Sequence, residues 1–297
     1  MNQEQVRELQ PKVFSYFQTV MTQGRLAHAY LFSGDFASYE MAIFLSQSLF
    51  CQEKEDALAC GQCRTCRLIE EGQFSDVTTL APQGNLIKTE MVRDLVKDFS
   101  RSGFESNQQV FIIREAEKMH ANAANSLLKV MEEPQSKIHL FLLTNKEEAV
   151  LPTIKSRTQI VTFPKNQPLI ERKLEEAGLL RNQAVLTAQL VSQLDQALDL
   201  AKSKSYLDLL AICRKFVDSL LHSQDRAYLL VPQLVTLAVE KAEQARLFEL
   251  LICLLADQMA EKKARQLLTA CLSAKKMWQA NVSLQNSLEY LVLQTQN

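Results

Sequence analysis

The first 164 residues alternate short apolar runs with helical patterns, and this alternation constrains the fold more than any other feature. Runs typical of β-strands lie at 29–32, 109–115, 138–144 and 158–163. Between the second and third runs, "ANAANSLLKVMEEP" has the apolar spacing of a helix, and a proline closes it. Strands that alternate with helices favour a parallel sheet covered on both faces, and therefore an α/β fold.

A linker, "FPKNQP" at 163–168, separates this region from a second half in which every segment has a helical pattern. Short helices are predicted over 165–205 and longer amphipathic helices over 206–297. Apolar stripes on the longer helices indicate a packed core, part of which could also be an oligomer interface. Pro232 is expected to break or begin a helix. The sequence thus predicts an α/β domain at 1–164 and two all-α domains at 165–205 and 206–297.

Composition limits the class of protein. Of the 297 residues only seven are glycine, which suits a helix-rich chain with few tight turns. The net charge of −1 argues against a chain coated with positive charge for nucleic acid. The N-terminus lacks the apolar segment of a signal peptide, and no apolar run approaches the length of a membrane span. A cytoplasmic location is expected.

Four of the seven cysteines lie close together, in "CQEKEDALACGQCRTC", as Cys51, Cys60, Cys63 and Cys66. This spacing lets four thiolates reach one ion, and zinc binds four thiolates at about 2.3 Å in closed structural sites. An iron–sulfur cluster and a redox pair are the alternatives. Because "CGQC" has two further cysteines beside it and no thioredoxin-like setting, structural zinc is favoured. The other three (Cys213, Cys253 and Cys271) are expected to be buried apolar residues.

The stretch "SGDFASYEMA" lies where a phosphate-binding P-loop would be expected, between a strand and a helix. When the pattern G-x-x-x-x-G-K-[ST] is laid on Gly34, Tyr39 falls at the second glycine, Glu40 at the lysine and Met41 at the Ser/Thr. Glu40 repels phosphate, and Met41 cannot bind Mg²⁺. The side chain of Tyr39 stands where the backbone should approach the ligand closely. This loop is therefore predicted to have lost its nucleotide chemistry.

A second nucleotide motif fails in the same way. In P-loop ATPases an apolar strand ends in an Asp that orients Mg²⁺ and a Glu that activates water. Here "VFIIREAEKM" has the apolar run, but Arg114 stands at the Asp position and Glu115 follows at the Glu position. An arginine places positive charge where the cation should lie. The two failures together indicate an ATPase scaffold without ATP in cis, with an unrelated α/β domain as the alternative.

The stretch "NSLLKVMEEPQSKIHLFLLTNKEEAVLPTIKSRTQIVTF", residues 125–163, resembles the clamp-loader branch of the AAA+ family. That family carries N-A-L-L-K-x-L-E-E-P-P, a strand ending in Thr-Asn, and then I-x-S-R-C. "HAYLFSG" upstream, the inserted four-cysteine module and "SDVTTLAPQGNLIKTEMVRDL" are similar to the bacterial DNA polymerase III members of this branch. The motifs cover about 1–164. Beyond them only the helical architecture agrees, as a small lid and then a collar domain.

The resemblance implies a role in an open ring of five subunits that loads the sliding clamp onto primed DNA. It implies a rigid, non-hydrolysing stator with gamma or tau and delta subunits as partners. Arg157, flanked by Ser156 and Thr158, matches the arginine that reaches a neighbour's ATP site. Thr158 replaces the family's cysteine, and Thr144 and Asn145 match the sensor-1 position. Read by residue type alone, Arg157 is an exposed arginine that pairs with a nearby carboxylate.

Two other functions stay open. An active AAA+ ATPase, such as a gamma or tau subunit, would need an intact G-K-T loop and an Asp in the second motif. A zinc-containing protein that binds DNA by itself would bind it tightly and in a salt-sensitive way, which the net charge of −1 disfavours. We identify no group of carboxylates suited to nucleotidyl transfer, so no catalytic residue in cis is predicted.

Overall fold

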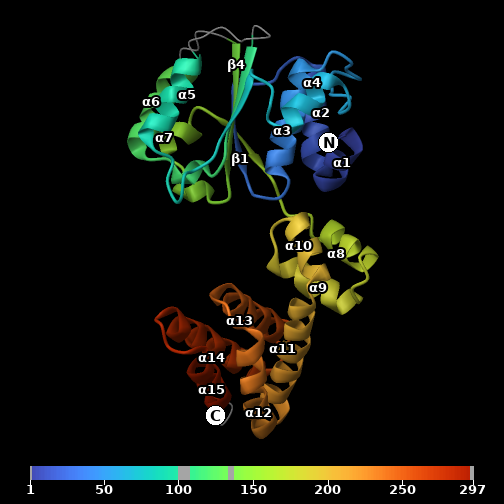
Figure 1. Cartoon of the computed structure of the whole chain (residues 1–297), viewed down its shortest axis with the longest axis vertical. Coiled ribbons are helices and arrows are strands. Elements are labelled where there is room, and N and C mark those ends of the chain that lie inside the picture. The colour runs from blue at the N-terminus through green and yellow to red at the C-terminus, as the bar shows by residue number, and fades with distance from the viewer. Residues whose placement is uncertain (1, 100–107, 133–136, 295–297) are drawn as a thin grey trace. The chain divides into compact units, whose positions relative to one another are not determined.

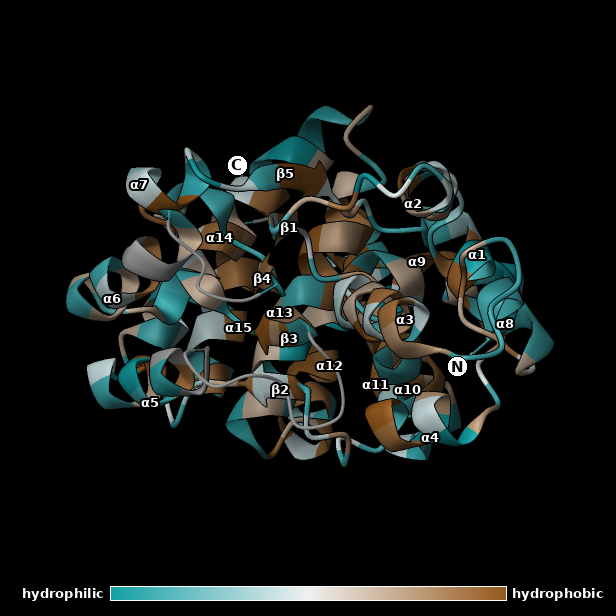
Figure 2. Cartoon of the chain, turned by 90° about the horizontal axis from the view of Figure 1, so that it is seen from above, coloured by the Kyte–Doolittle hydropathy of each residue, from teal (hydrophilic) through white to brown (hydrophobic). Residues whose placement is uncertain are grey.

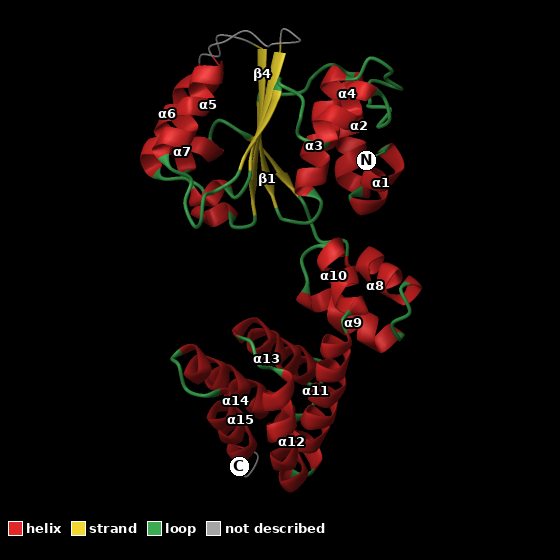
Figure 3. Ribbon diagram, in the orientation of Figure 1, coloured by secondary structure: helices red, strands yellow, loops and turns green. Residues whose placement is uncertain are grey.

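A computed structural model describes residues 2–99, 108–132 and 137–294 of the chain (Figure 1). The chain divides into two compact units, Met1–Asn166 and Gln167–Asn297. The first is an α/β unit and the second is entirely helical in its described part, as the sequence predicts (Figure 3). The finer division of the second half at residue 205 stays a prediction.

The first unit contains one sheet of five strands, which pair in parallel in the order β2-β3-β4-β1-β5. The strands are β1 (Ala29–Ser33), β2 (Val77–Leu80), β3 (Gln108–Ile113), β4 (Lys137–Thr144) and β5 (Gln159–Thr162). The connection that leaves β1 runs toward β2 at one edge of the sheet, whereas the connection that leaves β4 runs past β1 to β5 at the other edge. The topological switch point of the sheet therefore lies between β1 and β4. Ligand sites in open parallel sheets lie at the carboxyl ends of strands at such a point.

Helices cover both faces of this sheet (Figure 1). One face carries α1 (Gln3–Leu9), α2 (Pro11–Thr22), α3 (Ser38–Phe50) and α4 (Arg64–Glu70). The other carries α5 (Thr89–Phe99), α6 (Ala121–Glu132) and α7 (Pro152–Lys155), and two 3₁₀ turns lie at η1 (Ala116–Lys118) and η2 (Glu147–Ala149). The predicted α/β layering is therefore confirmed.

Strand β1 shows how alternation builds the two apolar layers. Tyr30 and Phe32 belong to the cluster beneath α2 and α3, whereas Ala29 and Leu31 belong to the cluster beneath α6. Successive side chains of a strand point to opposite faces, so a fully apolar strand suits a sheet buried on both sides. Figure 2 shows that many outer turns and loops of the chain are teal, that is, hydrophilic.

All four predicted strands need small corrections at their ends, and one strand is absent from the sequence analysis. β1 runs one residue further, to Ser33, and β4 begins one residue earlier, at Lys137. β3 ends at Ile113, before the predicted Glu115, because Glu115 has a left-handed backbone with φ 52° that no strand continues. β5 is shorter by one residue at each end than predicted. The missed strand is β2, a four-residue edge strand whose residues are only partly buried or exposed. The predicted helix over 121–134 ends at Glu132, and its last two positions lie outside the described residues.

The second unit consists of helices α8 to α15 in its described part. Their bounds are α8 (Gln167–Glu176), α9 (Arg181–Leu190), α10 (Leu194–Lys202), α11 (Lys204–His222), α12 (Gln224–Leu237), α13 (Lys241–Ala256), α14 (Lys262–Gln279) and α15 (Leu284–Leu293). Pro232 lies inside α12, so the expected break is wrong. Its ring displaces the hydrogen bond to the carbonyl of Tyr228, a residue that is 49% exposed, so water can satisfy that carbonyl.

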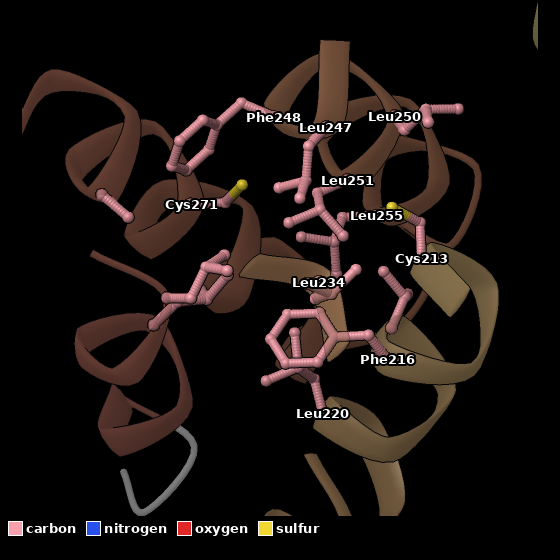
Figure 4. Packing of buried hydrophobic residues seen from close by; sticks show 14 of the residues in the cluster. Cys213, Phe216, Leu220, Leu234, Leu247, Phe248, Leu250, Leu251, Leu255 and Cys271 are labelled. Atoms are coloured by element: carbon pink, nitrogen blue, oxygen red, sulfur yellow. The ribbon is translucent and has the colours of Figure 1, made fainter. Parts of the chain in front are cut away.

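The predicted leucine stripes form the core of the second unit (Figure 4). Phe216 and Leu220 of α11 face Leu251 and Leu255 of α13, and all four are buried. The Cys213 and Cys271 thiols are buried in this core, as predicted, while Cys253 is half-buried. Burial raises the pKa of Cys271 to about 12, so the thiol behaves as a small apolar group. Among the described residues, no helix has the length and apolarity that crossing a bilayer requires.

Candidate functional site: the β1–α3 loop, a cysteine cluster and Arg157

The β1–α3 loop holds the residues that the sequence analysis compares with a P-loop, and its one matching glycine is used for packing. The Gly34 amide donates to the carbonyl of Thr144 at 2.8 Å, which joins the ends of β1 and β4. A Cβ on Gly34, whose φ is +122°, would lie 2.2 Å from the carbonyl oxygen of Phe163. Only glycine allows this approach of the β1 and β5 ends. The packing of the sheet is therefore sufficient to explain why position 34 is a glycine.

Helix α3 begins at Ser38, so Tyr39, Glu40 and Met41 lie in its first turn. Met41 is fully buried beneath the sheet, so it belongs to the core and faces no ligand. Glu40 puts a carboxylate at the helix N-terminus, which is the place where free amides and the helix dipole would attract phosphate. The N-terminus of α3 thus carries its own negative charge.

A buried glutamine closes the loop from below. The Gln10 side chain is 2% exposed, and its Nε2 donates to the carbonyls of Phe36 at 2.7 Å and Pro164 at 2.8 Å. These two bonds satisfy both amide protons of the side chain. The loop is thereby tied to the start of α2 and to the segment that leaves β5. The sequence analysis missed this residue, because it lies 154 positions from one of its two partners.

The two positions that depart most from nucleotide binding contact each other. The guanidinium of Arg114, after the end of β3, lies over the Tyr39 ring, with its carbon 4.7 Å from the ring centroid. This is a cation–π distance, and it pairs the residue that replaces the Mg²⁺-binding Asp with the residue that replaces the second glycine. Both substitutions therefore serve one contact between α3 and the end of β3.

Glu115 of the second motif and Thr144 of the sensor-1 match also form bonds within the chain. Glu115 forms an ion pair with Lys118, with 2.6 Å between Oε2 and Nζ. The buried Thr144 hydroxyl donates to Glu117 Oε2 at 2.7 Å and accepts from the Lys146 amide at 3.1 Å. Asn145, the other residue at the sensor-1 position, is exposed. The threonine is thus fixed by its own unit.

The four predicted cysteines converge. Cys51 follows α3, Cys60 and Cys63 lie in the connecting loop, and Cys66 is on α4. The four Sγ atoms all lie within 4.8 Å of one another, with 3.6 Å between Cys51 and Cys60 and 3.9 Å between Cys51 and Cys63. A tetrahedron with metal–sulfur bonds of about 2.3 Å has sulfur atoms about 3.8 Å apart. The donor set therefore fits one zinc-sized ion and involves more than a pair of thiols.

The chain around the cluster favours the thiolate form at Cys60 and disfavours it at Cys51 and Cys66, where burial raises the pKa of the thiol. Although burial opposes ionisation of Cys60, backbone hydrogen bonds from Gln62 and Cys63 lower its pKa to about 7. Burial raises the pKa of Cys66, so this thiol ionises only with help from a cation. Behind it, Gln47 Nε2 donates to the Cys66 carbonyl at 2.8 Å and anchors the start of α4. These bonds hold the ligand positions in place from the sheet side.

Arg157 lies between α7 and β5 and contacts its own unit through all three guanidinium nitrogens. Nε donates to Glu132 Oε1 at 2.7 Å, and Nη2 forms an ion pair with the same oxygen. Nη1 donates to the Thr153 carbonyl at 3.1 Å and to Ser156 Oγ at 3.3 Å. Arg157 thus pairs with a nearby carboxylate, as expected from its residue type alone, and that carboxylate belongs to Glu132. The side chain remains 36% exposed.

Thr158, which replaces the family's cysteine, fits its place. Its hydroxyl contacts the carbonyls of Ile154 at 3.2 Å and Lys155 at 3.3 Å, so the turn that carries Arg157 satisfies it. The sequence analysis assigns no role to Glu132. Because 25 residues separate it from Arg157, only the topology of α6, β4 and α7 reveals the pair.

Comparison with known proteins places this geometry in a family. Residues 9–167 match the family model described as DNA polymerase III, delta subunit. The DNA polymerase III subunit delta' of Bacillus subtilis is 30% identical over 99% of this chain and 98% of its own length. Its Pseudomonas aeruginosa counterpart is 37% identical over 44% of this chain and 41% of its own length. DNA polymerase III subunit tau of Escherichia coli is 32% identical over 46% of this chain and 22% of its own length.

A solved structure agrees on the fold. A DNA polymerase III gamma subunit-related protein from Thermotoga maritima has a TM-score of 0.53 at 17% identity and covers 95% of this chain and 98% of its own. The resemblance stated from the motifs is therefore confirmed. By its family model and by its full-length likeness to the B. subtilis protein, this chain belongs to the delta' subunit family of DNA polymerase III.

Proposed function

We propose that this chain is the non-hydrolysing stator of a DNA polymerase III clamp loader. The observation that carries the proposal is the contact between Arg114 and Tyr39, which joins the two failed nucleotide motifs. A loop whose Met41 is core and whose Glu40 places a carboxylate in the first turn of α3 offers neither a phosphate cradle nor a Mg²⁺ ligand. The chain therefore acts through its neighbours and has no ATP of its own.

The proposed setting is a hetero-pentameric ring in the cytoplasm. Its partners are gamma or tau subunits and a delta subunit, and the assembled ring loads the sliding clamp onto primer-template DNA. The likeness to a tau subunit and to a gamma-related fold supports this setting. Subunits with related folds can pack against one another through similar surfaces and so form one ring. In it, Arg157 reaches a neighbour's ATP and stabilises charge on the γ-phosphate. An arginine finger is worth about 10³–10⁵ in rate at a GTPase site.

The test uses a reconstituted clamp loader that contains this chain as Arg157→Ala. Size exclusion first verifies assembly, and ATPase rates are then measured with clamp and primed DNA. We expect the share of hydrolysis at the neighbouring site to be lost. The matched control is Arg25→Ala, an exposed arginine of the same unit, which should leave the rate unchanged. An assembled Arg157→Ala complex with the wild-type rate would reduce this subunit to architecture.

The alternative of an active ATPase is tested on the isolated chain. A ligand present at about 100 times its Kd stabilises the folded state by about 2.7 kcal/mol, which a melting curve detects. We expect Mg-ATP to leave the melting temperature of this chain unchanged, while a gamma or tau subunit under the same conditions is stabilised. Stabilisation of this chain by Mg-ATP would favour the ATPase reading.

The cysteine cluster is proposed to hold one structural zinc. Bound by Cys51, Cys60, Cys63 and Cys66, the ion supplies a closed cross-link and no Lewis-acid chemistry. Metal analysis should give one zinc per chain, none for Cys63→Ser, and one for the control Cys253→Ser. Iron with visible absorbance would instead indicate an iron–sulfur cluster.

The alternative of a protein that binds DNA by itself is tested on the isolated chain. Tight, salt-sensitive binding of DNA by this chain alone would favour that alternative.

A further inference from the structure

Glu132 contacts two of the three nitrogens of the Arg157 guanidinium. It is the last residue of α6, and its Oε1 faces both Nε and Nη2 of Arg157. A carboxylate at a helix C-terminus is electrostatically unfavourable, and a facing arginine compensates for it. Arg157 also donates to the Thr153 carbonyl near the end of α7. Two helix ends and one carboxylate thus hold the positive charge of Arg157 on its own subunit.

This arrangement conflicts with action in trans. A guanidinium recognises phosphate through a planar edge that presents two parallel N–H groups. Here Glu132 occupies the Nε–Nη2 edge, while Thr153 and Ser156 contact Nη1. A γ-phosphate on a neighbour must therefore compete with Glu132 for the same donors. Because the Glu132 side chain is 51% exposed, water screens the pair, and the competition is reversible.

We propose that Glu132 is a positioning residue that holds Arg157 back until a neighbour's nucleotide exchanges with it. The proposal rests on the trans role of Arg157 proposed above. With Glu132 in place, the guanidinium divides its time between the carboxylate of its own subunit and the phosphate of the neighbour. On this proposal, clamp and primed DNA shift the guanidinium toward the neighbour's phosphate. Glu132 therefore lowers idle hydrolysis and leaves the stimulated rate unchanged.

The experiment compares the reconstituted complex carrying Glu132→Gln with the wild type, after size exclusion has verified assembly. The kcat and KM for ATP are measured without clamp and DNA and again with both. Exposed ion pairs correspond to factors of about 1.5–5. We expect basal kcat to rise by about that factor while the stimulated kcat stays at the wild-type value. A basal kcat that is unchanged or lower would overturn the proposal.

Three further variants separate this effect from a merely structural one. Glu148→Gln removes an exposed carboxylate elsewhere in the unit and should change nothing. Glu132→Asp keeps the charge and should lie closer to the wild type than Glu132→Gln. In an Arg157→Ala background, Glu132→Gln should have no effect, because its partner is gone. If that background alone has the wild-type rate, the trans role fails and this proposal fails with it. If Arg157→Ala lowers the rate but Glu132→Gln leaves basal kcat unchanged, only the Glu132 proposal fails.

Discussion

Gly34 shows how a residue that matches a ligand-binding pattern can serve the packing of the sheet. In a phosphate-binding loop a glycine lets the backbone approach the ligand. Here it lets the end of β1 approach the carbonyl of Phe163, and its amide bonds to Thr144. Its backbone conformation, with φ +122°, is one that L side chains rarely adopt. The sequence pattern alone does not separate these two uses of the same glycine.

Replacing Gly34 by alanine is expected to destabilise the first unit by about 2–4 kcal/mol, from backbone strain and overpacking together. The control is Gly24→Ala, which has φ +64° but open space around the added Cβ, and which should cost only about 1 kcal/mol. Hydrogen exchange of the β1 and β4 amides measures both. Equal effects for the two variants would show that the contact with Phe163 relaxes without cost.

His139 on β4 is expected to make stability depend on pH. It is buried, its Nδ1 lies 3.2 Å from the Ala27 carbonyl, and its Nε2 has no hydrogen-bond partner. Burial lowers the pKa of His139 below its ordinary value of 6.5, because the charged ring would lose its hydration. Between pH 6.5 and the lower pKa of the folded state, His139 is therefore protonated in the unfolded chain and neutral in the folded chain. The resulting stability is complete above pH 6.5 and is lost as pH falls toward the folded pKa.

The measurement compares His139→Leu with the wild type by thermal unfolding between pH 5 and 7.5. The wild type should lose up to about 1.4 kcal/mol more per pH unit than the variant below pH 6.5. His120→Gln, at an exposed histidine, should follow the wild type. Parallel profiles for wild type and His139→Leu would mean that the buried ring does not sense pH.

At the scale of elements, the features that the sequence predicted best are those whose residues lie close together along the chain. β3 and β4 are recognisable because four or more apolar residues follow one another, as a strand buried on both faces requires. β2 was missed because an edge strand of four partly exposed residues carries no such signal. The cysteine cluster was predicted because its ligands lie within 16 residues. The Arg114–Tyr39 and Arg157–Glu132 pairs were not, because strand order alone brings their partners together.

Metal removal should act on one element of the first unit. In the proposed zinc site four cysteines would link the end of α3 to α4, and α4 has only seven residues, too few for stability by itself. Treatment with a chelator should therefore raise hydrogen exchange strongly over 51–70. The amides of α6, on the other face of the sheet, should change little and provide the control. Unchanged exchange over 51–70 after verified metal loss would show that packing alone holds α4.

At the scale of the whole molecule, two units have separate cores. The clusters of the first unit draw on the sheet and helices α1–α7, and the cluster of the second draws on α9–α15. Trp278, the only tryptophan in the sequence, belongs to the second cluster and donates to Gln244 Oε1 at 2.7 Å. The cysteine cluster belongs to the first. Each unit therefore carries its own probe of folding.

Urea unfolding should consequently not follow one transition. Tryptophan fluorescence reports the second unit, and hydrogen exchange of β1 reports the first. A chelator should shift the midpoint of the β1 transition to lower urea, because the proposed zinc would stabilise only the folded cysteine cluster. The Trp278 transition should stay where it is. If the chelator shifts both transitions equally, the units fold as one cooperative body, and events at the cysteine cluster then reach the helical unit through folding itself.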